Sequence, residues 1–386
     1  MVGLRGTWVK LLYLAQSDIP SQAANSVHVM KMCEAFSVQG CEVSLWLPDR
    51  KVPANTADVF SYYGVSACFE LCWISGMSWL KPSYAYAWQV FTRLLKARKL
   101  PDLVFSRSLL GAASALLAGA KVVLEVHQPM RDSGFLQGLI FRWIVRRKRF
   151  QRLVVITQAL KDWHLQQKLL SAELIEVAPD GADLPSVDMA GVVRDPAETA
   201  SFSVGYVGSL HQGKGMEVVL PLAQLMADVD FHVVGGADAQ LREWRGKAQG
   251  LSNLRFHGFM RPADVHTFML RMDVLLAPNQ HVVKGVGGGD IGRWTSPLKI
   301  FEYMAACKPI LASDLPVLRE VLLHEGNCLL CRADSPEQWG AAVRRLRGDP
   351  ALCQRLAARA HADLLEKYSW ACRAKILLAS LASLKQ

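Results

Sequence analysis

The sequence predicts an α/β protein that consists of two Rossmann-like domains in series. The chain has 386 residues, which is too long for a single compact core. Hydrophobic residues make up 51% of it and charged residues 20%, a composition typical of globular proteins. Short apolar segments alternate with helix-like segments in both halves, and turn-forming residues at 179–183 separate the halves.

The first half begins with a strand expected at residues 9–15, followed by a polar loop at 16–25 and a helix through Phe36. That helix is indicated by the helical spacing of Val29, Met32 and Phe36. The same alternation then continues along the chain. Further strands are expected at 42–47, 103–105, 121–126, 153–156 and 174–178, and helices at 111–118 and 160–166.

The second half repeats the pattern, with a strand at 203–206, a glycine loop at 207–215 and a helix to Met226. Later strands are expected at 231–234, 254–257, 274–277, 309–313 and 329–331, and helices at 262–270, 297–306, 336–347, 350–367 and after Trp370.

These elements predict two domains, at residues 1–185 and 201–367, joined by a linker at 186–200. Residues 368–386 are expected to form a C-terminal helix that packs back on the first domain. Parallel sheets bind ligands at the carboxyl ends of their strands, so a ligand is expected in the cleft between the domains.

The net charge of +10 comes mainly from the first half. Cations alternate with aromatic and aliphatic residues at 141–152, and a second stretch of this kind runs from 79 to 99. Such segments suit an anionic membrane surface, although a solvated helix face over a core stripe is the alternative. No nucleic-acid recognition motif accompanies the charge, so nucleic acid is not an expected partner.

The sequence contains no apolar stretch of the roughly 18–20 residues that a membrane-spanning helix needs, and no signal peptide. We therefore expect a cytoplasmic protein that is able to reach the inner face of the cell membrane.

The nine cysteines have irregular spacing. Cys328 and Cys331 form a C-x-x-C pair in an apolar run, without a second pair or a histidine nearby. Buried, reduced thiols are therefore expected, and no metal site.

The glycine loop of the second half has the properties of a phosphate-binding loop. Gly208 follows a strand, Gly215 precedes a helix, and Lys214 adds a positive charge. Glycines allow backbone amides to approach a phosphate. Similar loops also serve as plain turns, so this signal is weak by itself.

The segment from Ser296 to Glu302 gives a stronger signal. Ser296 is a good N-cap, and a proline follows it in the first helical turn. The free amides of Leu298 and Lys299 would then face an anion. Glu302, one turn later, could accept two ribose hydroxyls, or it could simply stabilise the helix dipole.

Together with other motifs, these segments resemble the GT4-type retaining glycosyltransferases of GT-B fold, in particular a bacterial branch. The resemblance covers nearly the whole chain and depends on the order and spacing of motifs that are each loose. They lie at residues 19–32, 125–127, 178–183, 207–215, 256–259, 296–305, 309–314 and 368–370.

The resemblance implies two Rossmann-like domains that face each other across a cleft, with these site residues. Glu302 would bind the nucleotide ribose, and Lys214, beside Gly208 and Ser209, would neutralise the donor diphosphate. The amides of Leu298 and Lys299 would hold the distal phosphate, Ser296 would start their helix, and the base would rest near Phe259. His127, at the end of a strand, would face the donor sugar and the acceptor, so His127 and Lys214 are the expected catalytic residues.

Two positions depart from the family pattern. Ser209 stands where the family has an arginine, and Lys299, His211 or Arg293 would have to replace that cation. Trp294 stands where the family has the first glutamate of an E-x7-E motif. Asp290, in the glycine-rich loop just upstream, is the expected substitute.

The implied activity is transfer of a sugar from a nucleotide-diphosphate sugar to a hydroxyl of a glycan or lipid-linked acceptor, in the synthesis of an envelope or surface polysaccharide. No cofactor and no metal would be needed. A non-catalytic sugar-nucleotide-binding subunit is an alternative, because of Ser209 and Trp294. A nucleotide-sugar 2-epimerase is a weaker one, since the extra acids that it needs are not evident.

Overall fold

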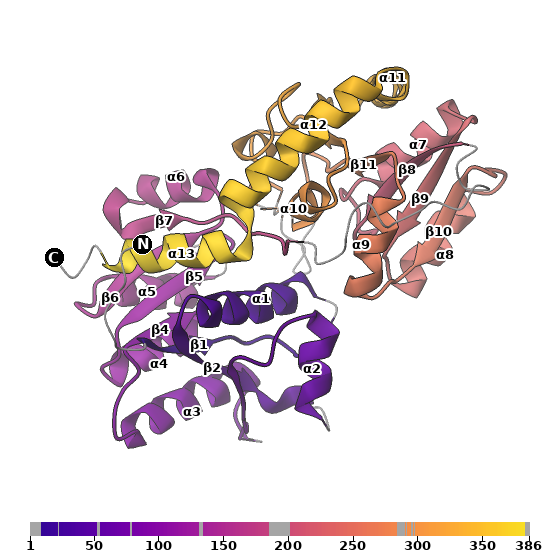
Figure 1. Cartoon of the computed structure of the whole chain (residues 1–386). Helices are drawn as coiled ribbons and strands as arrows, with labels where there is room; N and C mark the ends of the chain where they lie inside the picture. The colour runs from indigo at the N-terminus through magenta and orange to yellow at the C-terminus, as the bar shows by residue number, and fades with distance from the viewer. Residues whose placement is uncertain are drawn as a thin grey trace. The chain divides into compact units, whose positions relative to one another are not determined.

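The computed structural model of the chain divides into two compact units (Figure 1). Unit 1 contains Met1–Pro179 and Trp370–Gln386, and unit 2 contains Asp180–Ser369. The sequence placed the end of the first domain later, at residue 185, and the linker expected at 186–200 lies outside the described residues. The structure describes residues 9–21, 23–51, 55–77, 79–130, 134–184, 201–283, 290, 292–294, 296 and 298–382.

Unit 1 is built on a seven-stranded parallel sheet in the order β3-β2-β1-β4-β5-β6-β7. Its strands are short and mostly apolar, because helices cover such sheets on both faces. The strands are β1 (Val9–Leu14), β2 (Cys41–Pro48), β3 (Glu70–Ile74), β4 (Leu103–Ser106), β5 (Val122–Val126), β6 (Phe150–Val155) and β7 (Ile175–Val177). The order reverses between β1 and β4, which is the place where such sheets bind ligands.

Helices connect the strands of unit 1, and the C-terminal helix joins them. They are α1 (Ala24–Val38), α2 (Thr56–Tyr63), α3 (Pro82–Lys96), α4 (Leu109–Leu117), α5 (Phe135–Val145), α6 (Gln158–Gln166) and α13 (Trp370–Ala382). Helix α13 packs on α1, and α4 packs on both α3 and α5 (Figure 1). The last helix of the chain is thus part of unit 1.

Unit 2 is built on a six-stranded parallel sheet in the order β10-β9-β8-β11-β12-β13. The strands are β8 (Phe202–Val207), β9 (Val229–Val234), β10 (Leu254–Gly258), β11 (Val274–Ala277), β12 (Ile310–Ser313) and β13 (Leu329–Cys331). The helices are α7 (Met216–Leu225), α8 (Asp238–Lys247), α9 (Pro262–Leu270), α10 (Leu298–Ala305), α11 (Pro336–Gly348) and α12 (Pro350–Asp363).

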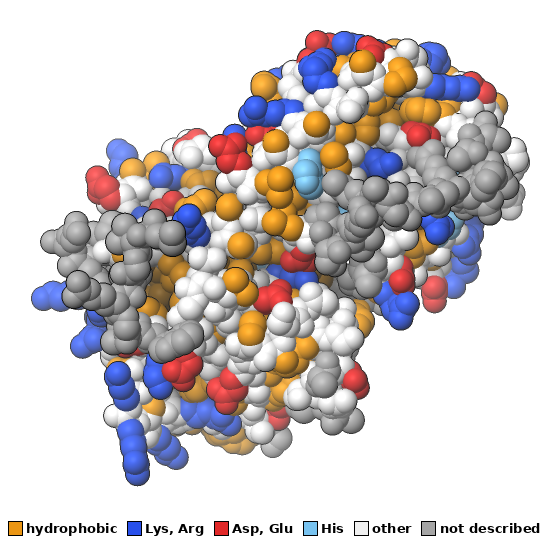
Figure 2. Space-filling view, in the orientation of Figure 1, with side chains coloured by type: hydrophobic (Ala, Val, Ile, Leu, Met, Phe, Trp, Pro, Cys, Tyr) orange, Lys and Arg blue, Asp and Glu red, His pale blue; other side chains and the backbone are white. Residues whose placement is uncertain are grey.

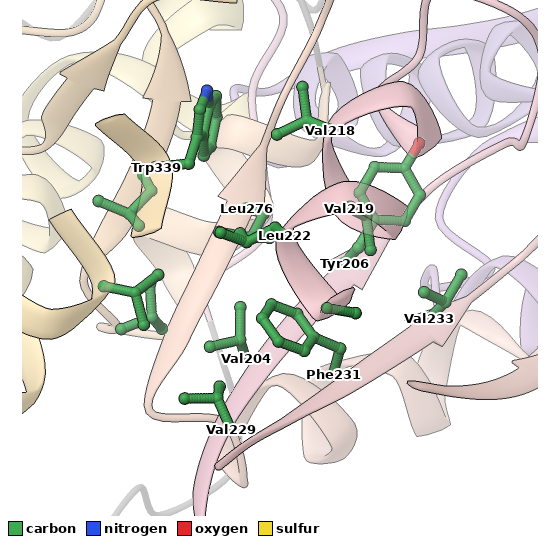
Figure 3. Packing of buried hydrophobic residues seen from close by; sticks show 14 of the residues in the cluster. Val204, Tyr206, Val218, Val219, Leu222, Val229, Phe231, Val233, Leu276 and Trp339 are labelled. Carbon is green, nitrogen blue, oxygen red and sulfur yellow. The ribbon is translucent and has the colours of Figure 1, made fainter. Parts of the chain in front are cut away.

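One of the hydrophobic clusters of unit 2 lies between its sheet and helices α7 and α11. Figure 3 shows Val204 of β8 and Phe231 of β9 close to Leu222 of α7, and it labels Trp339 of α11 in the same cluster. This packing fixes the carboxyl end of β8, from which the glycine loop departs.

Several elements have no counterpart among those that the sequence predicts. Strand β3 pairs with β2 at the edge of the sheet and is only partly buried. In α8, Leu241 and Trp244 are buried among polar residues, so its apolar periodicity is weak. No helix of the described chain combines the length and the apolarity that a membrane span requires.

Candidate functional site

The first turn of α10 holds a buried cation. The Nζ atom of Lys299 is inaccessible to solvent and has no hydrogen-bond partner among the described residues. It lies 4.3 Å from the ring centroid of Tyr206, and a Cβ atom at Gly208 would come within 3.0 Å of it. Burial, and then the charge of Lys214, lower the pKa of Lys299 to about 7, while Glu302 acts in the opposite direction. An ammonium buried without an acceptor is suited to receive an anion.

The glycine loop after β8 is held beside this ammonium by Tyr206. The hydroxyl of Tyr206 lies 2.8 Å from the carbonyl oxygen of Ser209 and 3.1 Å from that of Lys214, so it joins the two ends of the loop. Gly213 has a φ of 82°, and a Cβ there would lie 2.1 Å from the carbonyl oxygen of Val282. Glycine is therefore required at this close approach.

The amides of the loop are largely used within unit 2. Those of Gly213 and Gly215 donate to the Glu217 carboxylate, at 2.8 and 3.3 Å, and that of Gly208 donates to the carbonyl of Val234 at 3.0 Å. These three amides thus already have partners within unit 2, and their expected contact with a phosphate stays a prediction. The loop instead offers the side chain of Lys214, whose pKa is lowered by burial.

A second tyrosine joins α10 to the sheet. The hydroxyl of Tyr303 accepts a hydrogen bond from the amide of Val207 at 2.9 Å and lies 3.1 Å from the carbonyl oxygen of Leu276. The second half of α10 is thereby held against the ends of β8 and β11. Sequence reasoning missed both Tyr206 and Tyr303, although a buried tyrosine hydroxyl in a motif segment is a usable signal, because it needs a partner.

The other predicted donor-binding residues lie in different surroundings. Ser296 is buried, and its hydroxyl accepts a hydrogen bond from the amide of Asp180 at 3.1 Å. Leu298 is the first residue of α10, and Glu302 lies one turn further on. Phe259 follows β10 and is 46% exposed.

Asp290, the expected substitute for the missing glutamate, supports its own loop. Its Oδ1 atom accepts hydrogen bonds from the amides of Val283, at 3.0 Å, and Gly292, at 2.9 Å. One oxygen of this carboxylate is thus already committed within the loop.

The three candidate replacements for the missing arginine differ in where their charge lies. The exposed imidazole of His211 contacts the Gln240 side chain at 2.8 Å. The guanidinium of Arg293 is exposed and lies over the ring of Trp294. Among these three, Lys299 is the residue with its charge beside Gly208.

In unit 1, His127 lies just beyond the carboxyl end of β5 within a polar network. Its Nε2 atom is 2.6 Å from Oε1 of Glu125, and its Nδ1 atom is 3.1 Å from Nη2 of Arg107. The same Glu125 oxygen contacts Nε2 of His28 at 3.0 Å and Nη2 of Arg373 at 3.1 Å. Sequence reasoning identified His127 but missed Arg107, His28 and Arg373.

Glu125 is ionised in this network. Burial would raise its pKa, but the positive charge of Arg373, together with His28 and His127, outweighs burial and holds the pKa well below the usual range. Removing a buried partner from such a carboxylate costs folding free energy, so each member of the network is held in place by the others.

The group formed by His28, Glu125 and His127 has metal-ligand chemistry, with one ligand atom from each within 4.8 Å of the others. Its surroundings do not suit a divalent cation. Arg373 already binds the shared Glu125 oxygen, and Nε of Arg107 lies 3.9 Å from it. A metal ion would face two guanidinium groups, so the residues fit a hydrogen-bond network better than a metal site.

The two cysteines of the C-x-x-C pair lie on or beside β13. Cys328 and Cys331 are buried, and burial raises the pKa of each thiol to about 12. They are protonated thiols at neutral pH, and the expectation that this pair is buried is confirmed.

Both halves of the chain match known glycosyltransferase families. A family model described as Glycosyl transferases group 1 matches residues 201–349, and one described as Glycosyltransferase Family 4 matches residues 26–185. The phosphatidyl-myo-inositol mannosyltransferase of Mycobacterium leprae is 28% identical over 264 residues, which are 66% of this chain and 65% of that protein. Its counterpart in Mycolicibacterium smegmatis is 29% identical over 223 residues, 56% of this chain and 53% of that protein. The chain thus matches less than two thirds of the length of either relative.

Solved structures share the fold at low sequence identity. Anabaena Alr3699/HepE in complex with UDP and glucose superposes with a TM-score of 0.72 at 18% identity, covering 97% of this chain and 100% of that chain. Sucrose-phosphate synthase from Thermosynechococcus elongatus gives 0.72 at 16% identity, covering 97% and 98%. With two parallel sheets, two family matches and these neighbours, the chain belongs to the GT4-type glycosyltransferases and has the GT-B fold.

Proposed function

We propose that the protein is a retaining hexosyltransferase that moves a sugar from a nucleotide-diphosphate sugar to a hydroxyl of a glycan or lipid-linked acceptor. The observation that carries this proposal is the buried ammonium of Lys299, which lies beside Gly208 at the start of α10. A helix start and a cation without an acceptor together favour a phosphate ligand.

In the proposed reaction the bond between the anomeric carbon and the diphosphate oxygen breaks. Lys214, Lys299 and the amides of Leu298 and Lys299 stabilise the negative charge that develops on the leaving diphosphate. The acceptor oxygen attacks from the same face, and a leaving phosphate oxygen takes its proton, so the anomeric configuration is retained. Glu302 accepts hydrogen bonds from the ribose hydroxyls, and His127 contacts the acceptor or the donor sugar.

We also propose that the reaction needs no metal ion, because two lysine side chains and a helix start supply the positive charge at the diphosphate. Transfer should therefore continue at the same rate after dialysis against a chelator. A rate that falls with EDTA and returns with a divalent cation would assign that role to a metal.

Thermal-shift measurements with UDP, GDP, ADP and their sugars test donor binding. A ligand at 100 times its dissociation constant should stabilise the protein by about 2.7 kcal/mol. Lys299→Met should lose about half of this shift or more, whereas Lys247→Met should keep it, because Lys247 is an exposed lysine of α8 that pairs with Glu243. The proposal fails if no nucleotide raises the Tm of the wild-type protein, or if the ligand raises the Tm of both variants equally.

A lipid-linked acceptor is supported by the exposed surface of α5. Phe135 is 85% exposed, and Leu136 and Leu139 are exposed beside it. The exposed cations Arg146 and Arg147 follow directly. Apolar side chains next to cations suit an anionic membrane, and the mannosyltransferase relatives carry a lipid, phosphatidyl-myo-inositol, in their names. We propose that the protein works at the inner face of the cell membrane, in the synthesis of an envelope or surface polysaccharide.

Helix α3 of unit 1 also exposes aromatic side chains. It exposes Trp88 and Tyr84, and Figure 2 shows Lys and Arg side chains projecting from the part of unit 1 where Figure 1 places α3. Sedimentation with anionic and neutral liposomes tests the surface. Leu136→Ser should weaken the salt-sensitive binding, and Leu225→Ser, at an exposed position of α7 in unit 2, should not. Equal sedimentation with anionic and neutral liposomes would contradict the proposed binding to an anionic membrane.

A non-catalytic sugar-nucleotide-binding subunit is the second candidate, because Ser209 and Trp294 replace two charged residues of the family. An assay for free sugar distinguishes the two candidates, because a transferase slowly hydrolyses the bound nucleotide sugar. A protein that binds the donor, releases no free sugar and transfers none to an acceptor is the non-catalytic subunit.

A further inference from the structure

The contacts of His127 fix which of its ring nitrogens carries hydrogen. A guanidinium can only donate hydrogen bonds, so Nδ1 of His127, 3.1 Å from Nη2 of Arg107, must present its lone pair. Nε2 then carries the hydrogen and donates it to the ionised Glu125 at 2.6 Å. We infer that Arg107, Glu125 and Arg373 are positioning residues that hold His127 as one neutral tautomer in one orientation.

Arg373 brings the C-terminal helix into this network. It is 2% exposed, and its Nη2 atom is 3.1 Å from Oε1 of Glu125, a residue 248 positions earlier in the chain. Its Nε atom donates to the carbonyl of Pro179 at 2.9 Å, and Nη2 also lies 3.1 Å from the carbonyl oxygen of Ala178. Arg373 is thus anchored to the backbone after β7 while it compensates the charge of Glu125.

The charges of the network explain why His127 stays neutral there. One carboxylate, Glu125, faces two guanidinium groups, from Arg107 and Arg373, so the group carries a net positive charge before any histidine is protonated. A proton on Nδ1 of His127 would remove the acceptor of Arg107 and add a third cation. Among the described residues, His28 of α1 and Tyr13 of β1 are further titratable groups that face Glu125, and burial raises the pKa of Tyr13 well above its usual value.

This inference rests on the proposed function, in which His127 contacts the sugar or the acceptor. It deepens that function in one respect. With both ring nitrogens engaged, His127 is a fixed hydrogen-bonding and packing group and not the acceptor of the proton that is released. That agrees with a reaction in which the leaving phosphate takes the proton.

The first test reads the tautomer without any activity. The protein contains ten histidines, and a His127→Asn variant identifies the signals of His127 in spectra of ¹⁵N-histidine-labelled protein. At pH 7.5 we expect a pyridine-type signal from Nδ1 and a pyrrole-type signal from Nε2. Arg107→Met should shift these signals toward tautomer exchange, and Arg242→Met, which changes an exposed arginine of α8, should leave them unchanged. A pyrrole-type Nδ1 in the wild-type protein would overturn the inference.

The second test separates positioning from folding. Arg373→Met alone removes the buried guanidinium that compensates the charge of Glu125 and is expected to lower Tm. The double variant Arg373→Met/Glu125→Gln removes both charges and should recover most of the Tm. We expect its kcat to stay about tenfold or more below wild type, with the donor KM changed much less, because His127 is no longer held in place.

Full recovery of both Tm and kcat in the double variant would show that the pair is structural only. The proposed function and the inference about the His127 network would be contradicted by different results. If the wild-type protein transfers no sugar but binds nucleotide and shows the expected tautomer, the proposed function fails and the network inference stands.

Discussion

The ammonium group of Lys299 lies over the ring of Tyr206, 4.3 Å from its centroid. This contact joins the start of α10 to the glycine loop, since the Tyr206 hydroxyl also meets the carbonyl oxygens of Ser209 and Lys214. A cation–π contact of this kind stabilises a buried charge that has no hydrogen-bond partner among the described residues. It also puts a positive charge next to Ser209, where the family has an arginine.

Replacing Lys299 should separate ligand affinity from protein stability. Lys299→Met removes a charge-assisted contact worth about 1.5–3 kcal/mol, so the Kd for a nucleoside diphosphate should rise at least about tenfold. The Tm without ligand should stay equal or rise, because a buried charge without a hydrogen-bond partner is lost. Calorimetric titration and thermal unfolding measure the two quantities. An unchanged Kd together with a lower Tm would mean that Lys299 is structural.

The affinity for a diphosphate should depend on pH through Lys299. The ligand binds the charged form of the ammonium, and its pKa in the free protein is about 7. The Kd should therefore rise as pH increases from 7 to 8.5, by up to about tenfold per pH unit. The phosphate, with a second pKa of about 6, is mostly ionised over this range, so its own titration contributes little. Lys299→Met should flatten the profile, and a wild-type profile that is equally flat would contradict the assignment.

Stability without ligand should change in the opposite direction. The unfolded chain keeps Lys299 protonated up to about the usual lysine pKa of 10.5, while the folded protein loses the proton from about pH 7. Between these values the unfolded state binds more protons, so the free energy of unfolding increases with rising pH. The difference in Tm between wild type and Lys299→Met, measured at pH 7 and pH 9, isolates this contribution. It should shrink at the higher pH.

Removing the hydroxyl of Tyr303 should loosen the join between α10 and the sheet. Tyr303→Phe leaves the buried amide of Val207 without its partner at 2.9 Å, at a cost of about 1–3 kcal/mol. We expect a lower Tm and weaker diphosphate binding in the same variant. Tyr84→Phe is the matched control, because Tyr84 is 45% exposed on α3. Equal Tm values for the two variants would contradict the role of the hydroxyl.

The fold could be predicted because its strands are continuous apolar runs, buried on both faces, that alternate with helices. Other elements were not predicted, because their segments are polar or partly exposed. Helix α8 buries Leu241 and Trp244 within a polar segment, so no apolar stripe marks it. The position of β3 at the edge of its sheet likewise left it partly exposed.

The candidate site could be proposed from the sequence where its residues lie within one segment, as for Lys299 and Glu302 on α10. It was not predictable where partners come from distant parts of the chain. Tyr303 meets Val207 across 96 residues, and Arg373 meets Glu125 across 248. No local pattern of sequence encodes such pairs.

A substitution at Gly213 should test whether the shape of the glycine loop matters to binding. In Gly213→Ala the new Cβ would lie 2.1 Å from the carbonyl oxygen of Val282, at a φ of 82°, so the loop must move away. A residue forced into this conformation costs about 1–3 kcal/mol, and the move displaces Lys214 next to it. We expect a lower Tm and a Kd for nucleoside diphosphate raised about tenfold or more. Gly246→Ala is the control, because a Cβ in α8 meets nothing within 4 Å and alanine favours the helix by about 0.5–1 kcal/mol. If Gly213→Ala binds the ligand as tightly as Gly246→Ala does, the loop is a turn and takes no part in holding the diphosphate.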